Sequence, residues 1–215
     1  MRRAVVLLSG GLDSCVAATW ATMQRAQVHA LGVSYGQRHA VELEAAQTIA
    51  SSLRIPLHLV RADLTSIGTG DLFGAANIRH GNDANAVTRN VRPSTFVPAR
   101  NAIFLSLAST FARTVGATSI VVGSNADDAT GYPDCRREFF DAFEAVSRAG
   151  GFEVRVESPL VTMTKRQVVE FGRAIHAPID ASWSCYSPRE VNGRVEQCRL
   201  CDACSLRFAA MGEGA

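Results

Sequence analysis

The stretch that decides the fold lies near the N-terminus and reads Ala4-Val5-Val6-Leu7-Leu8-Ser9-Gly10-Gly11-Leu12-Asp13-Ser14. Its first five residues form an apolar, partly β-branched run that is typical of a buried strand. Residues 15–21 have the composition of a helix. The two glycines therefore lie on a strand-to-helix turn, where they can adopt unusual backbone angles and let a ligand approach closely. Because N–H groups at a helix N-terminus attract anions, the turn predicts a phosphate site.

Asp13 is unusual in such a site, because a bare carboxylate repels phosphate. It is explained either as an acid in the first turn of a helix or by a magnesium ion between the carboxylate and the phosphates. The pattern SGGxDS, in which Ser9 and Ser14 add hydroxyl donors, is neither GxxxxGK[ST] nor GxGxxG. It resembles the pyrophosphate loop of the ATP-pyrophosphatases. The alternative is an ordinary glycine turn, and chance agreement at five positions has a probability of about 10⁻³ or less.

Apolar strands alternate with amphipathic helices along the chain. Further strands are expected at 28–34, 57–60, 118–123 and 152–156, and helices at 41–53, 98–115 and 165–175. Another helix, after residue 136, is expected to turn inward Phe139, Phe140, Phe143 and Val146. This alternation predicts a Rossmann-like three-layer α/β/α fold with a mainly parallel five-stranded sheet. Ligands bind such sheets at the carboxyl ends of the strands, where the stretches after residues 8, 34 and 123 meet.

The segment 65–95 is different, because Gly, Asn, Asp and Arg dominate it and no period is sustained. A connection of this length is uncommon unless it serves as a lid or a binding loop. A disordered surface loop is the alternative.

The composition indicates one globular domain, 1–215, with 47% hydrophobic and 20% charged residues. No apolar run is long enough to span a membrane. The apolar patch after Arg2 and Arg3 is too short for a secretion signal, so a cytoplasmic protein is expected. A net charge of +2 does not suggest a nucleic-acid surface.

Four of the six cysteines crowd a C-terminal segment, 183–208, within this domain. Their spacing, Cys185-x12-Cys198-x2-Cys201-x2-Cys204, suits a tetrahedral zinc ion bound by four thiolates. An iron–sulfur cluster is the competing occupant, although its fourth cysteine usually lies downstream rather than upstream. Cys15 and Cys135 stand alone; a core or site-wall position is favoured for Cys15, whereas a wall and a nucleophile are equally open for Cys135.

Several motifs occur together in a fixed order. They are SGGLDS (9–14), YGQRH (35–39), VPARN (97–101), GYPDCR (131–136), SPL (158–160) with Lys165, and WSCY (183–186) followed by the last three cysteines. Over nearly its full length the chain therefore resembles the 7-cyano-7-deazaguanine synthase family. Two residues depart from that pattern, because Ala99 and Arg199 stand where glycine is expected.

The resemblance implies an adenine nucleotide alpha-hydrolase-like fold and a carbon–nitrogen ligase of queuosine biosynthesis. Such an enzyme converts 7-carboxy-7-deazaguanine, ammonia and ATP to the 7-cyano compound through adenylated carboxylate and amide intermediates. It also implies Mg²⁺ with ATP, one structural Zn²⁺ per chain, and a homodimer without nucleic-acid or membrane partners.

Roles follow by position in the motifs. The resemblance implies ATP binding by Leu8, Ser9, Gly10, Gly11, Leu12, Asp13 and Ser14. It implies catalytic roles for Asp13, Arg100 and Lys165, with Arg100 or Lys165 stabilising charge on the carboxylate or α-phosphate. It implies substrate contacts from Tyr35, Gln37, Asn101, Tyr132, Asp134 and Arg136. Asp134 would accept hydrogen bonds from the guanine-like N–H edge and Tyr132 would stack on the ring.

Two other functions compete with this one. Another ATP-pyrophosphatase, such as a tRNA-thiolating or tRNA-lysidine enzyme, would need a basic surface or an added RNA-binding domain. A nucleotide-binding zinc module without turnover would keep the loop and the cysteines but would not need Arg100, Asp134 or Lys165. Consumption of ATP that depends on a deazaguanine acid separates these alternatives.

Overall fold

A parallel sheet of five strands forms the centre of the molecule. A computed structural model describes residues 3–25, 27–36, 41–65 and 96–212. Within them the strand order is β3-β2-β1-β4-β5, and every neighbouring pair is parallel. The strands are β1 Arg3–Leu7, β2 Gln27–Ser34, β3 Leu57–Arg61, β4 Ser119–Val121 and β5 Arg155–Glu157. The predicted Rossmann-like α/β/α fold is confirmed.

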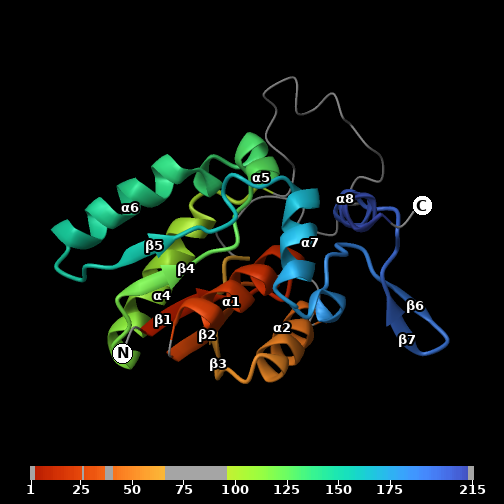
Figure 1. Ribbon diagram of the computed structural model, residues 1–215, viewed down its shortest axis with the longest axis horizontal. Helices are drawn as coiled ribbons and strands as arrows, with labels where there is room; N and C mark the ends of the chain where they lie inside the picture. The colour runs from red at the N-terminus through yellow and green to blue at the C-terminus, as the bar shows by residue number, and fades with distance from the viewer. Residues whose placement is uncertain (1–2, 26, 37–40, 66–95, 213–215) are drawn as a thin grey trace.

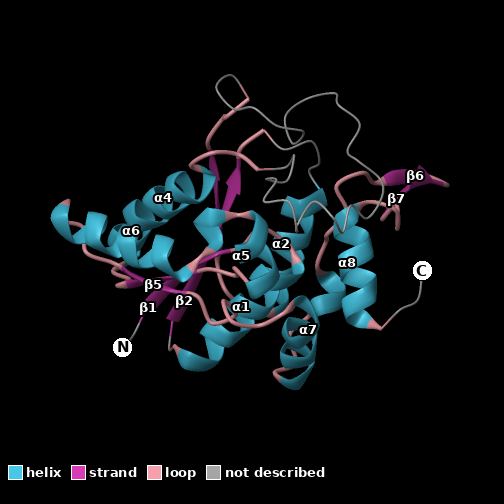
Figure 2. Ribbon diagram, turned by 90° about the horizontal axis from the view of Figure 1, so that it is seen from above, coloured by secondary structure: helices cyan, strands magenta, loops and turns pink. Residues whose placement is uncertain are grey.

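Helices cover both faces of this sheet. One face packs against α1 Leu12–Gln24, α2 Val41–Ser52 and α7 Lys165–Ala174, and the other against α4 Arg100–Val115 and α6 Arg137–Ala149. Successive strand residues point to opposite faces, so Ala4 and Val6 join the first core and Val5 joins the second. Figure 2 shows α4 and α6 on one side of the sheet and α1 and α7 on the other.

Short elements complete the chain. They are α5 Ala126–Gly131, the 3₁₀ turns Pro133–Cys135 and Ile179–Ala181, the antiparallel hairpin β6 Arg189–Val191 and β7 Arg194–Glu196, and α8 Asp202–Met211. Helix α8 packs against α7, and the hairpin projects from the body of the molecule (Figure 1). None of the helices in the described residues is both long and apolar enough to cross a membrane.

The structure differs from the sequence prediction in several places, among them β5, which begins at Arg155 rather than at residue 152. Val146 is 58% exposed, whereas Phe140 and Phe143 are buried, because α6 turns only a narrow stripe toward the sheet. Helix α4 begins at Arg100, two residues after Pro98. The stretch after β4, for which no helix was predicted, forms α5, whose N-cap Asn125 accepts a hydrogen bond from the backbone N–H of Asp128. Residues 66–95, most of the predicted lid or loop, lie outside the described residues.

The two departures from the family pattern share one backbone conformation. Ala99 has φ of 60° and Arg199 has φ of 59°, both in the left-handed region that favours glycine. This explains why glycine is expected at both positions. Ala99 is the N-cap of α4, and the Arg199 guanidinium lies 4.6 Å from the ring centroid of Phe208.

Candidate active site

The loop after β1 is shaped by close backbone contacts. Gly10 has φ of +89°, and a Cβ atom there would lie 2.0 Å from the carbonyl oxygen of Glu42 and 2.9 Å from the amide nitrogen of Ala46. The first turns of α2 therefore press directly on the loop, and only glycine fits. The loop also lies where the sheet order reverses, since β2 and β4 flank β1 on opposite sides. That is the usual ligand position in an open α/β sheet.

Hydroxyl groups hold the loop in position for an anion. The Oγ atoms of Ser9 and Ser14 lie 3.1 Å apart, and the N–H of Gly11 donates to Ser9 Oγ over 3.3 Å. Ser14 Oγ donates to the carbonyl of Gly11 over 2.9 Å. Leu8 and Leu12 are buried in the core, so they support the loop and can meet a ligand only through their backbone. The N-terminus of α1 thus presents its N–H groups beside two serines, as the phosphate prediction requires.

Asp13 and Lys165 form an ion pair beside this loop. The Lys165 ammonium donates to Oδ2 of Asp13, and the two side chains are 19% and 20% exposed. Lys165 opens α7 after a capping box made by Thr164 and Gln167, and its backbone N–H donates to Asp127 Oδ2 over 2.7 Å. Among the described residues Oδ1 of Asp13 is buried without a hydrogen-bond partner. The pair explains how an acid is held so close to a phosphate site.

A second acid shares this environment. Burial raises the pKa of Asp128 to about 6; Lys165 lowers it and Asp13 raises it further. Burial lowers the pKa of Lys165, but Asp13, Asp128 and Asp127 raise it above its usual value, so the ammonium stays charged. Carboxylate oxygens beside a phosphate loop are the ligands that Mg²⁺ prefers. Asp13 and Asp128 therefore fit a magnesium ion, and sequence reasoning missed Asp128.

The end of β4 touches the start of α1. A Cβ atom on Gly123 would lie 2.7 Å from the amide nitrogen of Ser14 and 2.9 Å from the carbonyl oxygen of Asp13. Both neighbours are backbone atoms, so they cannot move without displacing the loop.

Gly123→Ala is expected to reduce kcat/KM for ATP by tenfold or more, since a shift of about 1 Å in a site can cost 10²-fold. Steady-state kinetics checks this. The control is Gly151→Ala, whose φ of +72° strains the backbone but whose added Cβ atom meets nothing within 4 Å, so it separates the cost of an alanine from the cost of displacing the loop. Wild-type kinetics in the Gly123 variant would show that the β4 loop lies outside the nucleotide site.

A cluster of aromatic and charged groups lies at the same end of the sheet. Burial lowers the pKa of Arg100, and interactions with Tyr35, Tyr186, Tyr132 and Asp134 raise it. The guanidinium is also hydrogen-bonded to the Tyr35 side chain. These residues come from the end of β2, the start of α4, the segment after α5 and the cysteine segment. The structure thus brings together Tyr35, Arg100, Tyr132 and Asp134, which the sequence predicted separately, and adds Tyr186.

Asp134 offers an unused acceptor. Its side chain is 7% exposed, and its Oδ1 is buried without a hydrogen-bond partner among the described residues. Its Oδ2 accepts from the N–H of Asn101 over 3.4 Å, and Asn101 Nδ2 donates to the Asp134 carbonyl over 3.0 Å and to Cys135 Sγ over 3.4 Å. Burial raises the pKa of Cys135 to about 11, which favours a neutral site-wall thiol over a nucleophile.

One predicted substrate residue lies away from this cluster, and a second is not among the described residues. Arg136 is exposed, and its Nε donates to the carbonyl of Ala129 on α5 over 2.9 Å. Gln37 lies outside the described residues.

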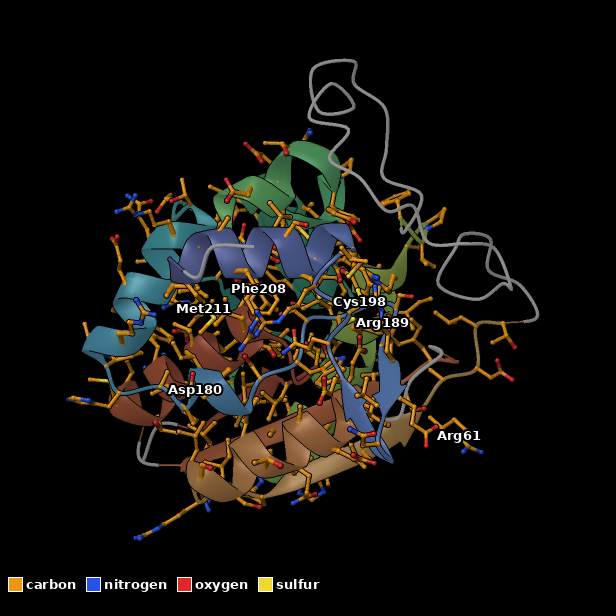
Figure 3. All side chains as sticks on the ribbon, turned by 90° about the vertical axis from the view of Figure 1, so that its right-hand side faces the viewer. Arg61, Asp180, Arg189, Cys198, Phe208 and Met211 are labelled. Atoms are coloured by element: carbon orange, nitrogen blue, oxygen red, sulfur yellow. The ribbon has the colours of Figure 1, made fainter. Side chains whose placement is uncertain are left out.

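The four cysteines of the C-terminal segment converge. The sulfurs of Cys185, Cys198, Cys201 and Cys204 all lie within 4.8 Å of one another and are buried. Backbone N–H groups of residues 187 and 198 donate to Cys185 Sγ, and those of residues 200 and 201 to Cys198 Sγ, as is typical of thiolates. Four thiolates about 2.3 Å from one ion lie about 3.8 Å apart, and Cys198 and Cys204 are separated by 4.0 Å. The donor set fits a single metal ion. Figure 3 shows Cys198 at one end of α8, near Arg189 of the hairpin.

The cysteine segment is joined to the phosphate loop. The N–H of Trp183 donates to the carbonyl of Gly10 over 2.8 Å. The buried Arg207 of α8 donates to Ser182 Oγ over 2.7 Å and to the carbonyl of Ile179 over 3.0 Å, which fixes the chain just before Trp183. The cysteine cluster and the loop are therefore parts of one structure.

Comparison with known proteins agrees with this arrangement. The family model described as "Queuosine biosynthesis protein QueC" matches residues 3–214. The chain belongs to the QueC family. A relative from Anaeromyxobacter dehalogenans is 43% identical over 99% of this chain and 92% of its own length, and one from Picrophilus torridus is 39% identical over 99% and 88%. Both are named 7-cyano-7-deazaguanine synthase, so the QueC resemblance predicted from the motifs is confirmed, and the family is one of enzymes.

Solved structures share the QueC fold at low identity. NMN synthetase from Francisella tularensis is 16% identical with a TM-score of 0.51, over 99% of this chain and 78% of that chain. The U34-tRNA thiolase NcsA from Methanococcus maripaludis was solved with its [4Fe-4S] cluster. It is 17% identical with a TM-score of 0.53, over 86% of this chain and 61% of that chain. These likenesses show the fold alone.

Proposed function

We propose that this chain converts 7-carboxy-7-deazaguanine, ammonia and ATP to 7-cyano-7-deazaguanine, as a carbon–nitrogen ligase. The observation that carries the proposal is the juxtaposition of two sites. A phosphate loop with a mostly buried ion pair lies beside a cluster that holds a cation, Arg100, and an unused buried acceptor, Asp134. The names of the relatives give the product.

ATP is needed because ammonia does not displace oxide from a carboxylate. The carboxylate oxygen attacks the α-phosphorus of ATP and pyrophosphate leaves. Ammonia then attacks the acyl carbon, AMP leaves and a proton is released, which gives the amide. The amide oxygen attacks a second ATP and pyrophosphate leaves again. Loss of AMP and of the two protons on nitrogen from the adenylated amide gives the nitrile. Positioning and electrostatic stabilisation are the protein's share of this chemistry.

The residues take their roles from their positions. The N–H groups of the loop, with Ser9 and Ser14, hold the departing pyrophosphate. Arg100 stabilises charge on the reacting carboxylate. Oδ1 of Asp134 accepts from the guanine-like N–H edge, with Asn101 orienting the carboxylate, and Tyr132 stacks on the ring. The exposed position of Arg136 does not support a direct substrate contact.

Two metals belong to the proposal. Asp13 and Asp128 would hold a magnesium ion, which would neutralise phosphate charge when bound with ATP. The four cysteines would hold one structural zinc ion. The compact set of sulfurs supports a single ion over a cluster like that of NcsA, because four irons hold their thiolates farther apart than one ion does. We further propose that the segment 183–208 folds as part of a single domain, which the bond from Trp183 to Gly10 supports.

The test is incubation with ATP, Mg²⁺, ammonium and 7-carboxy-7-deazaguanine, followed by mass spectrometry. We expect the nitrile together with AMP and pyrophosphate. Formation of AMP and pyrophosphate only with a different acid would contradict the proposed substrate. No nucleotide consumption with any acid would favour a binding module. The predicted homodimer, cytoplasmic location and lack of a nucleic-acid partner stay predictions.

Asp134→Asn should raise KM for the acid and lower its kcat/KM by about 10²-fold, because an amide N–H would then face the N–H edge of the ring. Kinetics with varied acid at saturating ATP measures this. The control is Asp141→Asn, a surface carboxylate that is 56% exposed and paired with Arg137. An unchanged KM in the Asp134 variant would place the ring elsewhere.

A further inference from the structure

Glu42 lies between the two halves of the proposed site. It is the second residue of α2, and its carbonyl oxygen limits Gly10 to glycine. Its backbone therefore touches the phosphate loop. From its position in the first turn, the sequence gives Glu42 only the ordinary role of an acid at a helix N-terminus.

The side chain of Glu42 faces the substrate cluster. The charged and titratable groups around it are Arg100 from α4, Tyr35 from the end of β2 and Tyr186 from the cysteine segment. Within the described ranges no ion pair includes Glu42, whereas Asp13 is paired with Lys165. Glu42 is thus a carboxyl group near Arg100 that is not neutralised by direct contact.

The carboxyl group of Glu42 can gain and lose a proton near neutral pH. Burial raises its pKa to about 7, and Arg100 opposes the rise. Burial also raises the pKa of Tyr35 and Tyr186, so both tyrosines are neutral there. A group whose pKa lies near the working pH is the most effective proton acceptor.

The proposed reaction, on which this inference rests, needs such an acceptor twice. When ammonia bonds to the acyl carbon and AMP leaves, the nitrogen must lose a proton. When AMP leaves the adenylated amide, the two protons that remain on the nitrogen must depart in turn as the C≡N bond forms. The formation of each adenylate, in contrast, releases only pyrophosphate from the ionised acid or the amide oxygen.

We propose that the Glu42 carboxylate accepts the protons released in the two nitrogen steps. The other acids of the site have other roles in the proposal: Asp13 lies against Lys165, Asp128 would hold magnesium, and Asp134 is bonded to Asn101 and would bind the ring. A carboxylate that only balanced the charge of Arg100 would affect acid binding and adenylation together. A proton acceptor would leave adenylation intact, and this difference separates the two roles.

The experiment compares Glu42→Gln with wild type in two assays. Acid-dependent exchange of pyrophosphate into ATP without ammonia reports adenylation, and nitrile formation reports the whole sequence. We expect exchange within about threefold of wild type and a nitrile kcat lower by about 10²-fold or more. Rates are expressed relative to the concentration of free ammonia. Wild-type kcat should then rise with pH through about 7, because the acceptor must be ionised. This rising limb of the pH profile should vanish in the variant.

Two further variants sharpen the result. Glu42→Asp keeps the carboxylate and should recover part of the lost kcat and the pH limb. Glu44→Gln, an exposed acid in the same helical turn, should match wild type in both assays. Equal losses of exchange and nitrile formation in Glu42→Gln, or a pH limb that persists there, would overturn the inference. Failure of the wild type itself to form nitrile would instead contradict the proposed function and with it this role.

Discussion

Replacing Lys165 by methionine should lower kcat/KM for nitrile formation by about 10³-fold. Methionine keeps the length of the side chain but removes the charge that lies against Asp13. The acids that remain, Asp13, Asp127 and Asp128, would then repel the phosphates of ATP. Removing one group that stabilises developing charge costs about 10²–10³ in rate, and the repulsion adds to that loss. Steady-state kinetics with varied ATP measures it.

The same variant should also be less stable, because breaking a mostly buried ion pair leaves an uncompensated charge at a cost of about 3 kcal/mol. For a domain of this size that lowers Tm by about 6–12 °C. Arg166→Met is the control, since Arg166 is on the same helix, 80% exposed, and paired only with Glu170 among the described residues. If Lys165→Met turned over like wild type, the ion pair would have no part in catalysis, whatever its effect on Tm.

Loss of the metal should unfold the C-terminal segment and with it impair the ATP site. Purified protein is expected to contain about one zinc per chain, and Cys201→Ser to contain almost none. Structural zinc sites supply about 10 kcal/mol or more of folding free energy, so Tm should fall by 10 °C or more. Elemental analysis and thermal unfolding measure both quantities.

The decisive part of that experiment is nucleotide binding. Because Trp183 is hydrogen-bonded to Gly10, Cys201→Ser should weaken ATP binding by about tenfold or more, measured by calorimetry below the Tm of the variant. Cys15→Ala is the control, a buried core thiol outside the cluster. Iron with visible charge-transfer absorption in place of zinc would contradict the metal assignment. Unchanged ATP affinity in the metal-free variant would contradict the link between the two regions.

Local patterns predicted most of the fold. The strand before Ser9 and the helix after it, the capping residue Thr164 and the spacing of the four cysteines are each encoded within a few neighbouring residues. Val146 was assigned wrongly because spacing alone does not say how wide a face a helix buries. The short helix α5 was missed because Asn125, Asp127 and Asp128 suit both a loop and a capped helix start.

Contacts between distant residues could not be predicted in the same way. Asp13 and Lys165 were both predicted in the site, but not as a pair, since 152 positions separate them. Glu42 and Tyr186 carry no local signal, because an acid in a first helical turn and a tyrosine after a cysteine have ordinary explanations. Their roles arise only where α2 and the cysteine segment meet at the carboxyl ends of β1 and β2.

The hydrogen bond between Trp183 and Gly10 bears on how the protein is made. Ribosomes synthesise a chain from its N-terminus, so the glycine loop emerges early and its partner emerges only after the whole sheet. The loop can acquire this contact only after the cysteine segment has been synthesised. A nascent chain without the cysteine segment therefore lacks one of the contacts that hold the glycine loop, so the order of synthesis delays the final geometry of the loop.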